Sequence, residues 1–144
     1  MDLVHATTVE VDGHAVLIRG PSGSGKSDLA LRLMDSGAVL VADDQTLLSA
    51  ESGRLFASPP DTIAGLIEVR GLGVVRVAYC PRAPVCLAVT LVATGEVERL
   101  PEREHDTLLG VPVPLARLAP FEASAPAKVR LAMRSAVRDI MAAP

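Results

Sequence analysis

Short apolar runs separated by glycine-rich turns dominate the first part of the chain. Residues 15–18 (AVLI) form an apolar run that stops at Gly20, which predicts a buried strand entering a turn. From residue 27 to about residue 36, apolar residues recur at helical spacing, and Gly37 supplies a helix stop. Residues 38–42 (AVLVA) are again strand-like. Because the crossover is a compact helix, we expect the two strands to be parallel and the connection right-handed.

The middle of the chain reads as a series of strands with turns between them. The expected strands cover residues 45–50, 54–58, 67–69, 74–78 and 85–92. A turn at Ser52-Gly53 joins the first two as a hairpin, and Asp61 is placed to cap a short helix that runs through Leu66. The last of these strands is apolar except for Thr90, which is typical of a strand buried on both faces at the centre of a sheet.

Prolines mark the last third of the chain. Residues 95–125 contain four of them and are therefore expected to form an irregular connection. Pro126 then begins a predicted helix that ends near Met141. Its apolar face consists of Val129, Met133, Val137 and Ile140. The whole pattern predicts one α/β domain over residues 1–144, a mixed sheet with flanking helices.

Composition and charge exclude several classes of function. The chain has 144 residues, of which 49% are hydrophobic, so it can bury a core, and its formal net charge is -3. A negative chain is not expected to bind nucleic acid or anionic membranes, both of which require a positive surface. Cys80 and Cys86 lack the spacing of a zinc site, and we expect both to be reduced thiols. No apolar run is long enough to span a bilayer. We therefore expect a soluble cytoplasmic protein.

The turn after the first predicted strand matches the phosphate-loop pattern GxxxxGK[ST]. Its residues are Gly20, Pro21, Ser22, Gly23, Ser24, Gly25, Lys26 and Ser27. Glycines let the backbone N–H groups wrap closely around phosphate, Lys26 adds a full positive charge, and Ser27 offers a hydroxyl to Mg²⁺. The alternative is a glycine-rich turn with an exposed lysine. The flanking strand and helix favour a nucleotide-phosphate site.

Two adjacent carboxylates, Asp43 and Asp44, follow the strand at residues 38–42. The carboxyl ends of parallel strands meet at one edge of a sheet, so we expect both aspartates beside the phosphate loop. Successive strand residues point in opposite directions, which predicts two different roles: one carboxylate binds Mg²⁺ and the other faces the phosphoryl acceptor. The alternative is a pair of aspartates that only begins a turn.

Together with Glu68-Val69-Arg70-Gly71-Leu72-Gly73, these residues resemble the catalytic domain of HPr kinase/phosphorylase, whose signature reads close to E-[IV]-R-G-L-G. His5, fifteen residues before Gly20, is a third match. A fourth is Glu98-Arg99-Leu100, similar to a family segment that carries a catalytic arginine. The resemblance is strong over residues 5–77 and weaker afterwards.

The resemblance implies an ATP- and Mg²⁺-dependent kinase that acts on a serine of the phosphocarrier HPr, with a P-loop fold similar to phosphoenolpyruvate carboxykinase. The same family centre also runs phosphorolysis, in which inorganic phosphate attacks the phosphoserine. The implied catalytic residues are His5, Lys26, Asp43, Asp44 and Arg99. The implied metal ligands are Ser27, Asp44 and Glu68, and which aspartate is the base stays open.

Three departures from the family pattern are visible. Asp28 stands where the family usually has glutamate, and residues 120–125 (PFEASA) replace a segment containing a G-R-N triplet associated with phosphorolysis. Members commonly carry an additional N-terminal domain, whereas this sequence begins near the catalytic domain. The resemblance also implies a homo-oligomer. Two alternative functions remain: a nucleotide-sensing regulatory module without turnover, and a small-molecule kinase of the carboxykinase-like superfamily.

Overall fold

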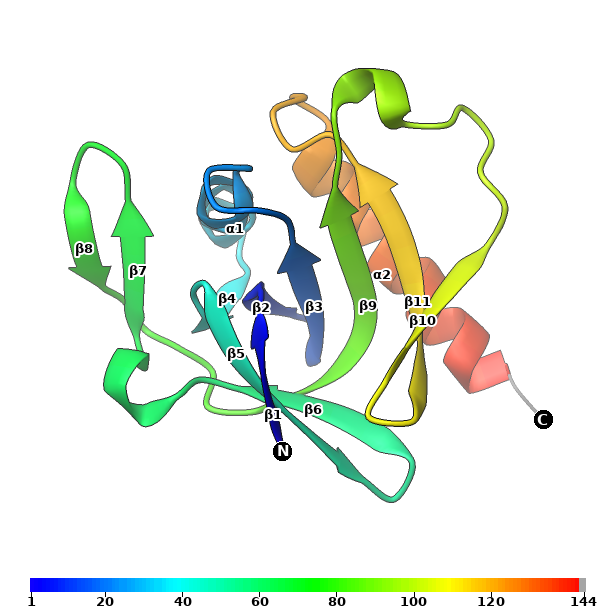
Figure 1. Cartoon of the computed structure of the whole chain (residues 1–144), viewed down its shortest axis with the longest axis horizontal. Helices are drawn as coiled ribbons and strands as arrows, with labels where there is room; N and C mark the ends of the chain where they lie inside the picture. Colours follow the sequence, from blue (N-terminus) through cyan, green and yellow to red (C-terminus); the bar gives the residue numbers. More distant parts are fainter. Residues whose placement is uncertain (143–144) are drawn as a thin grey trace.

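A strongly curled mixed sheet and two helices make up the molecule in the computed structural model, which describes the backbone of residues 1–142 and the side chains of residues 1–138 (Figure 1). The helices are α1 (Lys26–Asp35) and α2 (Ala125–Ala142). The strands are β1 (Asp2–His5), β2 (Thr7–Val11), β3 (His14–Arg19), β4 (Val39–Ala42), β5 (Gln45–Glu51), β6 (Arg54–Ser58), β7 (Leu66–Val69), β8 (Gly73–Arg76), β9 (Ala83–Leu91), β10 (Glu104–Leu108) and β11 (Val111–Leu118).

Strand β9 occupies the centre of the main sheet, as its apolar sequence predicts. It pairs in parallel with β3 and β11 and antiparallel with β6. Leu87 and Val89 belong to the core cluster that includes the helices, and Ala88 belongs to a second cluster inside the curl of the sheet. Because both faces are covered, a strand with no polar face is stable here.

The predicted strand, helix, strand unit is present, but its two strands are not neighbours. Strand β2 lies between β3 and β4 and pairs antiparallel with each, so β3 and β4 run in the same direction and end at the same edge. Neither β1 nor β2 was among the expected strands. In β2, Thr7 and Thr8 are buried although they are polar, which weakens the hydrophobic signal of a strand.

The prediction of an irregular connection over residues 95–125 was wrong. Residues 104–118 form the hairpin of β10 and β11, and β11 adds to the central sheet. Pro112 and Pro114 lie in the first half of β11, whereas the pairing with β9 begins only at Leu115. The missing N–H groups therefore interrupt no hydrogen bonds of the central ladder.

The helix predicted from Asp61 through Leu66 is also shorter than expected. One 3₁₀ turn, η1 (Asp61–Ile63), is present, and Leu66 already begins β7. Strands β7 and β8 pair only with each other, over the described residues, and this hairpin stands apart from the main sheet (Figure 1). A second single turn, η2 (Thr94–Glu96), follows β9.

Both helices contribute to the larger core cluster. Leu29 and Leu33 of α1 and Val129 and Met133 of α2 are buried in it, and Val137 packs against it. Of the apolar face predicted for α2, the side chain of Ile140 lies outside the described residues. The core thus fixes α1 against the sheet, with the start of the helix near the ends of β3 and β4.

Candidate functional site

The segment between β3 and α1 forms a tight loop with glycines in left-handed conformations. Gly23 has a φ of 80° and Gly25 a φ of 102°, backbone values that side chains with a Cβ rarely adopt. The N–H of Ser24 donates to the carbonyl of Pro21 at 3.0 Å, which closes a turn inside the loop. The strand, glycine-rich loop and helix therefore occur in the order that a phosphate-binding loop requires.

Lys26 is the first residue of α1 and its side chain turns back into the loop. Its Nζ donates to the carbonyl oxygens of Gly20 at 2.9 Å and Pro21 at 3.1 Å. The residue is only 5% exposed, so its charge is largely removed from bulk water. A positive group held this way, beside the N-terminus of a helix, favours an anion in the loop.

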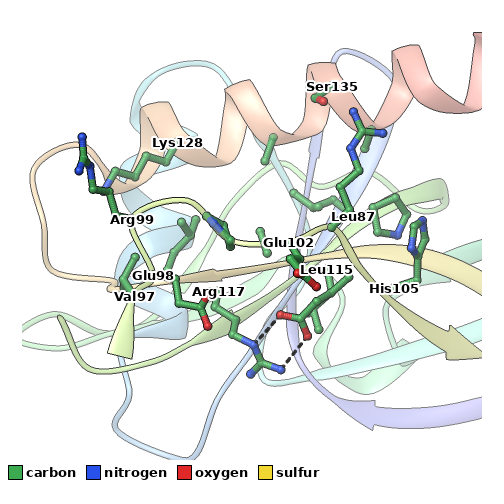
Figure 2. Close-up of a pocket in the computed structure, with 18 of the residues that line it drawn as sticks. Leu87, Val97, Glu98, Arg99, Glu102, His105, Leu115, Arg117, Lys128 and Ser135 are labelled. Atoms are coloured by element: carbon green, nitrogen blue, oxygen red, sulfur yellow. Dashed lines mark hydrogen bonds and ion pairs between the residues drawn. The ribbon is translucent and has the colours of Figure 1, made fainter. Parts of the chain in front are cut away.

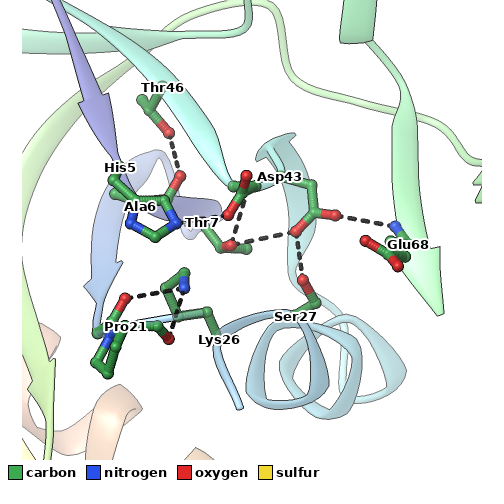
Figure 3. Close-up of polar contacts among 11 residues, drawn as sticks. His5, Ala6, Thr7, Pro21, Lys26, Ser27, Asp43, Thr46 and Glu68 are labelled. Atoms are coloured by element: carbon green, nitrogen blue, oxygen red, sulfur yellow. Dashed lines mark hydrogen bonds and ion pairs between the residues drawn. The ribbon is translucent and has the colours of Figure 1, made fainter. Parts of the chain in front are cut away.

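Asp43 is buried and its carboxylate accepts three hydrogen bonds (Figure 3). Oδ1 accepts from the hydroxyl of Ser27 at 2.6 Å and from that of Thr7 at 3.1 Å. Oδ2 accepts from the backbone N–H of Glu68 at 2.9 Å. One carboxylate thus joins the start of α1, strand β2 and the β7–β8 hairpin.

Asp44 lies next to Asp43 but faces different surroundings. Its carboxylate Oδ1 lies 2.7 Å from Nε2 of His5, and the side chains of both residues are about half exposed, at 59% and 47%. Its φ of 66° is left-handed, which aspartate tolerates better than most residues. This turn directs the carboxylate toward β1, whereas Asp43 faces α1.

Thr7 connects the two aspartates and was not identified from the sequence. The same hydroxyl that donates to Asp43 accepts the backbone N–H of Asp44 at 3.0 Å. The signal that could have revealed it is the pair of threonines that begins strand β2, two residues after His5. Thr7 is fully buried, so this hydroxyl holds both carboxylates in fixed positions.

A cavity of about 470 Å³ lies over this region, a volume within the range of small-ligand sites. Its lining includes Ser22, Gly23, Gly25, Lys26, Ser27 and Glu68, all of them predicted site residues. Phe121 also lines it and was not predicted. The loop, the helix start and the β7–β8 hairpin therefore enclose one space.

Arg99 lies elsewhere in the structure. It lines a separate cavity of about 480 Å³ between the segment after η2, strand β11 and helix α2 (Figure 2). Lys128 of α2 lines the same cavity, and both side chains are labelled in the close-up. Among the residues that the structure describes, Arg99 is absent from the lining of the phosphate-loop cavity, so the two predicted parts of the site are not brought together.

The chemistry of the donor set suits Mg²⁺ better than a transition metal. Within the described part of the chain, no three His, Cys, Asp or Glu side chains gather as a metal cluster. Mg²⁺ is commonly bound by one or two carboxylates together with phosphate oxygens and water. Asp43 with the hydroxyl of Ser27 meets that description, so it is Asp43 rather than the predicted Asp44 that contacts the loop serine.

Neither α1 nor α2, over their described residues, combines the length and the apolar character that crossing a membrane requires.

Comparisons with known proteins show which family the chain resembles. The family model described as HPr Serine kinase C-terminal domain matches residues 1–129. An HPr kinase/phosphorylase from Chlorobium phaeovibrioides is 39% identical over 130 residues, covering 81% of this chain and 39% of that protein. One from Mycoplasmopsis pulmonis is 46% identical over 74 residues, covering 51% of this chain and 24% of that protein. The chain thus spans well under half the length of these relatives.

A solved structure extends the likeness to the whole fold. The Hpr(Ser) kinase/phosphatase from Coxiella burnetii is 27% identical, with a TM-score of 0.85, and the match covers 98% of this chain and 99% of that one. Sequence and structure therefore lead to the same conclusion: the chain belongs to the HPr serine kinase C-terminal domain family.

Proposed function

We propose that this chain is a kinase domain that transfers the terminal phosphoryl group of ATP to a serine of the phosphocarrier protein HPr. The names and similarity of its relatives support the proposal. The observation that carries it is the 2.6 Å hydrogen bond between Ser27 and Asp43, with the His5–Asp44 pair directly beside it. We assign the fold to the P-loop type similar to phosphoenolpyruvate carboxykinase and, by family likeness, expect a homo-oligomer.

The phosphate side of the reaction belongs to the loop and to Asp43. The N–H groups of the loop and the Lys26 ammonium bind the β- and γ-phosphates. Lys26 then gives up its hydrogen bonds to the carbonyl oxygens of Gly20 and Pro21 and donates to phosphate oxygens instead. Ser27 and Asp43 would hold Mg²⁺, and Glu68 lines the same cavity as Ser27. When bound, Mg²⁺ neutralises negative charge on the transferred group. Thr7 and the N–H of Glu68 keep the Asp43 carboxylate oriented toward this position.

The acceptor side belongs to Asp44. Its side chain is 59% exposed and can be reached by a protein substrate, whereas Asp43 is buried. Asp44 accepts the proton of the serine hydroxyl as that oxygen attacks the terminal phosphorus, and the bond to the ADP oxygen breaks. His5, 2.7 Å away, orients the carboxylate during this transfer. Arg99 lines the other cavity, so we assign it no role in this step.

The test is phosphoryl transfer from labelled ATP to HPr in the presence of Mg²⁺, with HPr that lacks its acceptor serine as the control. Asp44→Asn is expected to lower kcat about 10²- to 10⁴-fold, the range for a general base, while ATP binding persists. Asp43→Asn is expected to weaken Mg²⁺-dependent ATP binding as well. Absence of label on HPr would contradict the proposal, and tight ATP binding without transfer would instead support a regulatory module.

A further inference from the structure

The cavity over the phosphate loop continues along the side of α1, beyond the residues assigned to phosphate and metal. Ser27 and Asp28 line it in the first turn of the helix, and Leu31 lines it one turn later. Four helical residues advance by about 6 Å, so the cavity extends about that far along the helix from Ser27 to Leu31. Phe121, from the segment before α2, lines the same space.

Phe121 is the aromatic residue that this cavity offers, in a chain with two phenylalanines, one tyrosine and no tryptophan. Its side chain lies against the backbone of the phosphate loop: a Cβ atom added to Gly25 would meet its Cζ at 2.8 Å. The residue is nevertheless 69% exposed. A ring that touches the loop along one edge and leaves most of its surface open presents a flat apolar face at a ligand cavity.

The segment that carries Phe121 is tied down on both sides of it. Arg32 of α1 donates to the carbonyl of Pro120, and at 3.3 Å to the carbonyl of Glu122. The Glu122 carboxylate also lies 3.6 Å from Nζ of Lys128 in α2. Because both neighbours of Phe121 are anchored, the ring is held in place rather than exposed by a loose loop.

We propose that the base of the bound nucleotide stacks on the ring of Phe121. The inference rests on the proposed function, since it requires ATP with its terminal phosphates at Lys26. The phosphates fix one end of the nucleotide, and the base then lies along the cavity, where Phe121 and Leu31 supply apolar surface. Every base has a π-face, so this contact adds affinity for ATP and GTP alike and does not read the base edge.

The test compares four proteins: wild type, Phe121→Ala, Phe121→Trp and Leu131→Ala. Leu131, 61% exposed on α2 and outside the lining of the phosphate-loop cavity, is the matched control for loss of an exposed apolar side chain. Calorimetry with Mg²⁺ measures the Kd of ATP and of inorganic tripolyphosphate, which has the phosphates without a base. Circular dichroism establishes that each variant is folded.

We expect Phe121→Ala to raise the Kd of ATP about 10-fold, within the range measured when a stacking residue is removed, and to leave that of tripolyphosphate unchanged. Phe121→Trp should retain ATP binding. Because the chain has no other tryptophan, its fluorescence is a local reporter that ATP should alter and tripolyphosphate should not. Leu131→Ala should resemble wild type with both ligands.

Each other outcome is decisive. If Phe121→Ala binds ATP as wild type does, or loses ATP and tripolyphosphate equally, the stacking contact is refuted while nucleotide binding stands. If wild type binds neither ligand, the proposed function fails together with the inference. If it binds tripolyphosphate and ATP with the same Kd, the loop binds phosphate but the base makes no contact.

Discussion

Replacing Thr7 with valine tests the arrangement of the two aspartates, because its hydroxyl is shared between them. The substitution keeps the shape of the side chain but removes the donor to Asp43, 3.1 Å away, and the acceptor for the N–H of Asp44, 3.0 Å away. We expect both carboxylates to lose their common anchor. Phosphoryl transfer and stability should therefore fall together.

The expected size follows from the partners that remain. A hydrogen bond to a charged group contributes about 1.5–3 kcal/mol, and Asp43 retains Ser27 and the N–H of Glu68, so the lower value applies. The N–H of Asp44, left without its acceptor, adds about 1 kcal/mol. A total of about 2.5 kcal/mol corresponds to a fall in Tm of about 8 °C for a chain of this size. Displacement of the carboxylates by an ångström would lower kcat about 10- to 100-fold.

The neighbouring residue provides a matched control. Thr8 is equally buried, but its hydroxyl pairs with that of Thr46 at 2.9 Å, away from the aspartates. Thr8→Val should cost about 1 kcal/mol and leave kcat unchanged. Thermal unfolding and transfer from labelled ATP to HPr at varied Mg²⁺ measure both effects. If Thr7→Val and Thr8→Val have the same kcat and the same Mg²⁺ dependence, Thr7 does not position the carboxylates.

Three further changes probe other parts of the structure. Gly25→Ala should abolish ATP binding, because the φ of 102° at this position and the Phe121 ring, 2.8 Å from the new Cβ, both oppose a side chain there. Gly23→Ala, whose new Cβ has no atom within 4 Å, should weaken ATP binding less. Equal Kd values for ATP in the two variants would refute the steric argument. Burial raises the pKa of Cys86 to about 12 from 9.0, so its thiol stays protonated. The stability gained by burying the protonated thiol is present below pH 9 and lost as pH rises toward 12. A disulfide reagent at pH 8 should label Cys80 alone in the folded protein and both cysteines after denaturation; rapid labelling of two thiols in the folded protein would contradict this. Arg130→Met removes the hydrogen bonds to the carbonyl groups of Leu33 and Ser36 and to the hydroxyl of Ser36, at the end of α1, while keeping the apolar stem of the side chain. The free energy of unfolding, measured by denaturant titration, should fall by about 1–2 kcal/mol. An unchanged denaturation midpoint would count against this prediction.

Elements with a strong local pattern could be predicted from the sequence. Helix α1, the hairpin of β5 and β6, the central β9 and helix α2 each have a periodicity or turn signal within their own residues. Strands β2 and β11 lack it: buried threonines interrupt the first and prolines the second. What makes them strands is the ladder they share with β3, β4 and β9.

The candidate site divides in a similar way. The phosphate loop and the paired aspartates are local patterns whose chemistry can be read residue by residue. The separate surroundings of Asp43 and Asp44 depend on Thr7, 36 and 37 residues away, and on the N–H of Glu68. The location of Arg99 in another cavity depends on how the segment after η2 folds over β11.

By itself, the sequence determined which groups this protein has for binding phosphate and Mg²⁺, because a glycine-rich loop, a lysine and carboxylates have that chemistry wherever they lie. Only the tertiary structure decided which carboxylate meets Ser27, which one meets His5, and that Phe121 lies over Gly25. The physical reason is that these contacts join segments distant in the chain, and no local periodicity records the distance between side chains that packing alone brings together.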